Sequence, residues 1–192
     1  MSFGAVRIGK IKYIKIGSNE KMEEEEQKLV EKKLKIEGQF KGGANWFFWI
    51  AGLSLVNSII LFTGSEWGFI VGLGITRIID VVGLVIAEEV GIVGKILALF
   101  FDVIAAGIFV VFGVFSRKGY KWAFVVGMIL YAMDGLIFLL VKDFLSIGFH
   151  VFALFCIYGG FKASKKLNEM ERKALLNTRQ APASDTPLAG TQ

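Results

Sequence analysis

Residues 72–84 read GLGITRIIDVVGL, an apolar run that holds an arginine and an aspartate three residues apart. Charged groups are costly to bury, and inside membranes they face the interior of a helix bundle or a water-filled cavity. On a helix, Arg77, Asp80, Leu84 and Glu88 follow one another in steps of three and four and share one face. This stretch therefore decides whether its part of the chain crosses a membrane or lies along one.

The overall composition indicates a membrane protein. Of the 192 residues 54% are hydrophobic, which exceeds the roughly 45–50% of a soluble domain. The 23 glycines suit helices that pack closely in lipid. Charged residues gather in 1–41 and 162–192, whereas 44–161 hold few. The sequence therefore predicts an all-α, polytopic transmembrane helix bundle with two polar ends.

Charge and cysteine usage restrict the function classes. The net charge of +5 comes from basic flanks without a nucleic-acid-binding motif, so the expected partner is the lipid bilayer and not nucleic acid. The single Cys156 excludes a disulfide framework and a cysteine-based metal site. No cofactor motif and no nucleophile–base pair are present, so we expect a non-enzymatic protein without a cofactor.

Five apolar segments divide the middle of the chain. Each has 18 to 24 residues, and a helix that spans a bilayer needs about 20. Short connections favour antiparallel neighbours. We therefore expect a bundle of about five helices within residues 42–162. The segments are 44–62, 67–87, 92–115, 122–141 and 144–161.

The two polar ends have different patterns. Residues 1–41 form a charged N-terminal extramembrane segment, in which 6–16 alternate basic and apolar as in a short strand or a membrane-surface segment. Within it, 20–37 predict a helix, acidic first and basic later, that is either solvated or docks a partner. Residues 163–192 predict a basic helical extension followed by a disordered tail.

The positions of basic residues complicate a count of five spans. Both ends are basic, as is the connection at 117–121, and the positive-inside rule places all three in the cytoplasm. They share a side only if 67–87 or 92–115 fails to cross. The alternative is therefore four spans plus one interfacial or re-entrant helix, and the orientation stays open.

A row of small residues precedes Asp80 in the sequence. Gly64, Gly68, Gly72 and Thr76 recur every four residues and end at Asp80. Rows of this kind form close-packing helix faces. We therefore expect a helix-packing ridge that directs Asp80 into the bundle.

Counting from the segment ends predicts a polar layer inside the membrane. The three aspartates and the histidine fall roughly 9–15 Å from their adjoining turns, and Arg77 falls a turn deeper. Three roles are open: a structural one that includes an Arg77–Asp80 ion pair, a proton or ion pathway, and a divalent cation site. The layer consists of Arg77, Asp80, Asp102, Asp134 and His150.

Several stretches together resemble a family of small, uncharacterised bacterial multi-pass inner-membrane proteins. They are NWFFWIAGLSLVNS (45–58), FIVGLGITRIIDVV (69–82), KWAFVVGMILYAMDGLIFLL (121–140) and DFLSIGFHVFALFCIYGGFKA (143–163). The resemblance implies a bacterial inner membrane and no particular activity.

Two functions are consistent with these patterns. The first is a non-enzymatic accessory, scaffold or complex subunit that forms homo-oligomers or joins membrane-complex partners. The alternative is a small transporter, channel or proton-coupled protein that uses the Asp/His layer.

Overall fold

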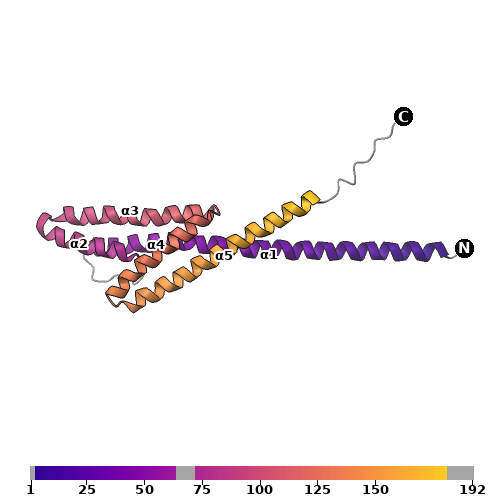
Figure 1. Cartoon of the computed structure of the whole chain (residues 1–192), viewed down its shortest axis with the longest axis horizontal. Helices are drawn as coiled ribbons and strands as arrows, with labels where there is room; N and C mark the ends of the chain where they lie inside the picture. The colour runs from indigo at the N-terminus through magenta and orange to yellow at the C-terminus, as the bar shows by residue number, and fades with distance from the viewer. Residues whose placement is uncertain (1–2, 64–71, 181–192) are drawn as a thin grey trace, which may run out of the picture.

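The protein is an all-helical bundle (Figure 1). The computed structural model describes residues 3–63 and 72–180, with side chains for 21–63 and 72–179. Within these residues there are five helices and no strand, which confirms the predicted fold class. The helices are α1 (Phe3–Phe62), α2 (Gly74–Val90), α3 (Ile92–Arg117), α4 (Lys121–Leu140) and α5 (Phe144–Gln180).

Helix α1 is unbroken over 60 residues, about 90 Å at 1.5 Å per residue. The prediction of a separate helix at 20–37 is therefore wrong in its boundaries, and a strand at 6–16 is wrong. No proline interrupts residues 3–62, and pairs of opposite charge one turn apart support the exposed part. The Nζ atoms of Lys28 and Lys41 lie 3.6 and 2.7 Å from carboxylate oxygens of Glu24 and Glu37.

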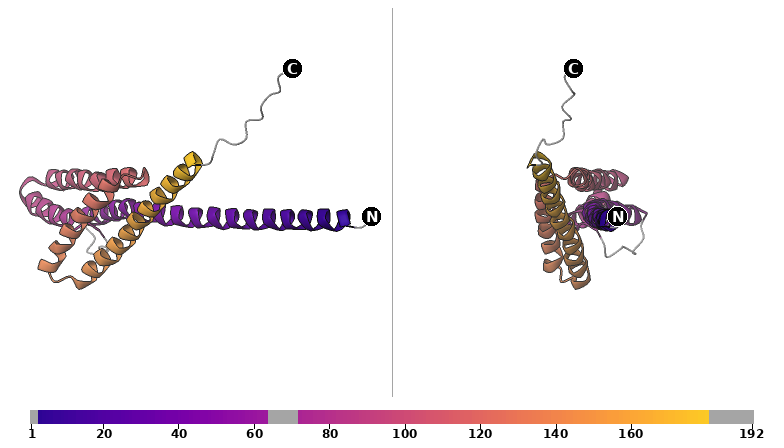
Figure 2. Two further views of the ribbon diagram at one scale, coloured as in Figure 1. Left: turned by 45° about the vertical axis from the view of Figure 1, so that its right-hand side comes forward. Right: turned by 90° about the vertical axis from the view of Figure 1, so that its right-hand side faces the viewer.

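Helix α5 crosses α1 where two glycines meet. A Cβ atom at Gly43 would overlap the backbone of Gly160, and one at Gly160 would overlap the backbone of Gly43. Such contacts let two helix backbones approach closely. Beyond the crossing, Lys33 and Glu171 lie 3.8 Å apart. The extension of α5 therefore braces α1 outside the apolar segment, and α1 then projects alone (Figure 2).

Aromatic rings fill the centre of the bundle. The ring of Phe47 lies 6.2 Å from the rings of both Phe112 and Phe124. It fits against α4 because residue 127 is glycine, where a Cβ would come within 2.6 Å of the ring. This core joins α1, α3 and α4.

Helix α2 differs from the other four helices in its capacity to span a membrane. The other four helices contain segments long and apolar enough to span a membrane, among the residues that the structure describes. The 17 residues of α2 rise about 25 Å, less than the roughly 30 Å of a hydrocarbon core. The predicted helix at 67–87 does not extend through its first described residues, since helix begins only at Gly74. Four spans with one further helix therefore describe the bundle better than five spans.

The basic segments gather at one end of the bundle. The exposed part of α1 and the extension of α5 leave at the same end (Figure 1). The guanidinium of Arg117 lies 5.9 Å from the ring of Phe48, so the α3–α4 turn is also at this end. At the opposite end Phe62 and Lys95 line one small cavity. The three basic segments thus share a side, as an even number of spans requires.

Candidate functional site

The structure brings together two residues of the predicted layer, Asp134 on α4 and His150 on α5. Nε2 of the imidazole lies 3.0 Å from Oδ2 of Asp134. Nδ1 lies 2.8 Å from the carbonyl oxygen of Ser146. Since a carbonyl oxygen only accepts, the bond to Ser146 requires the tautomer with its proton on Nδ1. Both side chains are buried, with 7% and 2% of their surface exposed.

The same aspartate caps the start of α2. The backbone N–H groups of Gly74 and Ile75 donate to Oδ2 and Oδ1 of Asp134 at 2.7 and 2.9 Å. A carboxylate is favoured there because the first N–H groups of a helix lack partners within it and carry partial positive charge. The cap residue Leu73 supplies no side-chain hydrogen bond of its own. Asp134 therefore fixes α2 to α4 and, through His150, to α5.

Helix α1 holds the residue just before α2. The N–H of Leu73 donates to Oγ of Ser54 at 2.8 Å, and Oγ of Ser54 donates to the carbonyl of Ile50 at 2.8 Å. Oγ1 of Thr76 donates to the carbonyl of Leu73 at 2.8 Å. The start of α2 is thus held from α1 and α4 together. The sequence does not reveal this role of Ser54, because Leu73 lies 19 residues further along the chain.

Aromatic side chains enclose the imidazole. The ring of Tyr131 stacks on His150 at 4.3 Å with an interplanar angle of 16°, and the ring of Phe138 lies 5.1 Å away. A Cβ at Gly135 would come within 3.1 Å of the imidazole. The Asp134–His150 pair is therefore tightly enclosed and fully hydrogen-bonded.

A second polar cluster lies where α1, α2 and α3 meet. Oγ of Ser58 donates to Oδ2 of Asp80 at 3.0 Å. The carboxyl group of Asp102 faces both side chains and has no exposed surface. Among the described residues, neither oxygen of Asp102 has a hydrogen bond of good geometry. Two adjacent carboxyl groups therefore meet here with a single hydroxyl donor between them.

Little space adjoins this second cluster. The cavity lined by Ser58, Asp80 and Lys95 has a volume of about 10 Å³, which is room for one water at most. No ion pair joins Lys95 to Asp80 or Asp102 in the described part of the chain. The cluster is therefore compact and has no cationic partner in contact.

The predicted single layer is two separate clusters. Asp134 binds the first residues of α2, whereas Asp80 lies six residues further along, a rise of about 9 Å. The divalent cation alternative fails because the imidazole and the Asp80–Asp102 pair belong to different clusters. Among the residues that the structure describes, no three His, Cys, Asp or Glu side chains are placed to hold a metal ion.

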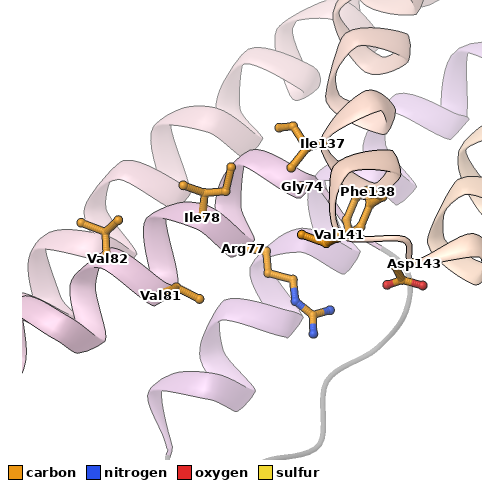
Figure 3. A pocket seen from close by; sticks show the side chains of 9 residues that line it. All are labelled: Gly74, Arg77, Ile78, Val81, Val82, Ile137, Phe138, Val141 and Asp143. Carbon is orange, nitrogen blue, oxygen red and sulfur yellow. The ribbon is translucent and has the colours of Figure 1, made fainter.

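Arg77 belongs to neither cluster. Its side chain is exposed, and no ion pair links it to Asp80 within the described residues. Instead it lines a groove between α2 and the C-terminal part of α4, as Figure 3 shows. The Arg77–Asp80 ion pair that the sequence allowed is therefore wrong.

The predicted glycine ridge is also different in the structure. Gly64 and Gly68 lie outside the described residues, and Gly72 precedes the helix, where a Cβ would come within 2.8 Å of Nδ2 of Asn57. Thr76 is buried in the first turn of α2. A continuous helical row through Gly72 is therefore wrong, because α2 starts two residues after it.

Other small residues make the close contacts of α2. A Cβ at Gly83 would overlap Cβ of Ala98, and one at Gly94 would lie 2.7 Å from the backbone nitrogen of Ala87. Two small-residue pairs four apart, Gly83–Ala87 and Gly94–Ala98, flank a short turn. This spacing was the signal in the sequence for the α2–α3 contact.

Comparison of the chain with known protein families, with curated proteins and with solved structures finds no match.

Proposed function

We propose that the chain is a non-enzymatic scaffold or accessory subunit of the bacterial inner membrane, which presents the N-terminal half of α1 to a partner as a rigid arm. The observation that carries this proposal is the continuity of α1 from the exposed segment into the bundle. An unbroken helix transmits the position of the bundle to its far end without a hinge.

The contacts of α5 support a fixed arm. Ile36 and Phe40 of α1 are buried in the core together with Ala163 of α5. The ion pair between Lys33 and Glu171 lies one further turn along α1. Residues 21–32, the part of the arm whose side chains the structure describes, are exposed and have no such cover, so they are available to a partner.

Apolar side chains on this arm support a docking role. Met22, Leu29, Val30 and Leu34 expose 56–62% of their surface. An exposed apolar patch on a helix is typical of recognition, in which anchors three, four or seven residues apart enter a groove. Met22 and Leu29 are seven apart, and Val30 and Leu34 are four apart.

The distribution of basic residues favours a cytoplasmic arm. The arm, the α5 extension and the α3–α4 turn, which holds Arg117 and Lys118, lie at one end of the bundle, and cytoplasmic segments carry an excess of lysine and arginine. The bacterial inner membrane follows from the resemblance described above and shares its status as a proposal.

Site-specific photocrosslinking in native membranes tests the arm. A photoreactive residue at Leu29 is expected to give one discrete crosslinked product. The matched position is Glu31, which lies about 160° around the helix from Leu29 and should give none. Equal products from both positions, or none from any position on the arm, would contradict docking through this apolar face.

One observation favours a second candidate, a proton- or ion-coupled membrane protein. Asp102 is fully buried with both carboxyl oxygens poorly bonded, beside the partly exposed Asp80. Adjacent carboxyl groups readily share a proton. Proton flux into proteoliposomes under an imposed membrane potential separates the candidates. The scaffold predicts the leak of empty liposomes, whereas coupling predicts a flux that Asp102→Asn abolishes.

A further inference from the structure

The groove beside Arg77 has the shape and lining of a lipid site. It lies between α2 and α4 and has a volume of about 500 Å³, within the range of small-molecule sites. Its walls are apolar (Figure 3). They consist of Ile78, Val81 and Val82 of α2 with Ile137, Phe138 and Val141 of α4.

The apolar walls open toward the surroundings of the bundle. Ile78, Val81 and Val82 expose 45–54% of their surface, and Val141 exposes 68%. In a bundle with four spans, such side chains contact lipid chains. Because α2 is too short to span, the groove follows the side of a partial helix. An acyl chain therefore fits its apolar part.

Two opposite charges stand at one end of the groove. Figure 3 shows the guanidinium of Arg77 and the carboxylate of Asp143 at the same end, away from Ile137. No ion pair joins these two side chains in the described part of the chain. Both charges are therefore available to a ligand at the mouth.

Asp143 keeps its charge at neutral pH. It lies in the α4–α5 turn, where Oγ of Ser146 donates to Oδ2 at 2.7 Å and the Ser146 N–H donates to Oδ1 at 3.2 Å. These bonds, the side-chain one first, hold the pKa of the Asp143 carboxyl below its usual range, and the charge of Arg77 adds to the effect. Arg77 is protonated at any physiological pH.

We propose that this groove binds an ethanolamine phospholipid, with its phosphate on Arg77, its ammonium on Asp143 and an acyl chain along the apolar walls. Guanidinium binds phosphate through two parallel hydrogen bonds. A primary ammonium donates hydrogen bonds to a carboxylate, whereas the quaternary ammonium of a choline lipid cannot. An anionic glycerol lipid leaves Asp143 without a cation. The paired charges therefore select a zwitterionic headgroup with a primary amine.

Native mass spectrometry of the full chain in detergent tests the site. The probes are ethanolamine, choline and glycerol phospholipids with identical acyl chains. The wild-type protein should retain the ethanolamine lipid about ten- to a hundredfold more than the other two, the effect of one charge-assisted hydrogen bond. Asp143→Asn should lower its retention to that of the choline lipid, and Arg77→Gln should lower the retention of all three.

Two controls separate lipid binding from effects on folding and on net charge. Asparagine is a good helix N-cap, so Asp143→Asn should preserve the start of α5, which a thermal unfolding curve verifies. Lys118→Gln removes a charge at the opposite end and should leave lipid retention unchanged. Preference for the glycerol lipid, insensitive to Asp143→Asn, would overturn the selectivity. Equal retention of all lipids in the wild type and Arg77→Gln would mean nonspecific annular lipid and would overturn the site.

Discussion

The two polar clusters use the same residue type in opposite ways. Both oxygens of Asp134 accept backbone hydrogen bonds, and its partner His150 is bonded through both ring nitrogens. The carboxyl group of Asp102, in contrast, is equally buried but has no hydrogen bond of good geometry among the described residues. Burial alone therefore does not tell which intramembrane charge stabilises a fold. The number of hydrogen-bond donors that reach the charged group decides whether it stabilises the fold.

Helix α2 explains why the clusters differ. A helix that starts inside the bundle brings unbonded N–H groups there, and Asp134 bonds two of them. Asp80 lies further along the same helix, where the backbone is already bonded to itself. Among the residues that the structure describes, a single hydroxyl, that of Ser58, donates to its carboxyl group.

The largest effect is expected from Asp134→Ala. The substitution removes the acceptor for two N–H groups and for the buried imidazole, and loss of one member of a buried pair costs about 3–5 kcal/mol. Denaturant unfolding in detergent micelles measures this loss in the free energy of unfolding. Asp134→Asn keeps one carbonyl acceptor and should lose less. A loss of under about 1 kcal/mol for alanine would remove the distinction between the clusters.

A somewhat smaller loss is expected at the helix crossing that supports the arm. Gly160→Ala places a Cβ into the backbone of Gly43, and overpacking of this kind costs about 1–3 kcal/mol. The adjacent Gly159 has nothing within 4 Å of an added Cβ. Gly159→Ala is therefore the matched control and should be neutral or stabilising. Equal unfolding free energies for the two variants would show that α1 and α5 do not meet there.

The second cluster should respond in the opposite direction to the first. Asp102→Asn removes the repulsion between two carboxyl groups and supplies an amide donor to Asp80. The free energy of unfolding should stay unchanged or rise by up to about 2 kcal/mol. A loss as large as that of Asp134→Ala would mean that both clusters stabilise the bundle in the same way.

The smallest effect concerns a carboxylate outside both clusters. Because the pKa of Asp143 is lowered by its bonds to Ser146, its contribution is complete above the unfolded pKa of about 3.9. It is lost as pH falls through the lower folded value. A series of Tm values taken down through this range should fall more steeply for the wild type than for Asp143→Asn. Parallel curves would exclude the contribution.

Much of the architecture could be predicted from the sequence, and the reason is hydropathy. Five apolar segments of spanning length predicted the helical class. Basic residues at both ends of the chain and at 117–121 made five full spans inconsistent with the positive-inside rule. The start of α2 could not be found, because its cap comes from Asp134, 60 residues from Gly74 along the chain. A count of residues from the segment ends also predicted Asp80 and His150 in one layer, because such a count does not show which helices are neighbours.

The central claim is that α1 is one rigid helix from the exposed arm into the bundle. Spin labels at Glu25 and Gly52, both exposed, in a Cys156→Ala background and a lipid nanodisc, measure it directly by pulsed electron paramagnetic resonance. Their backbones are separated by 27 residues, so one narrow distance distribution near about 40 Å is predicted. A broad distribution, or a main distance well below this value, would contradict the rigid arm.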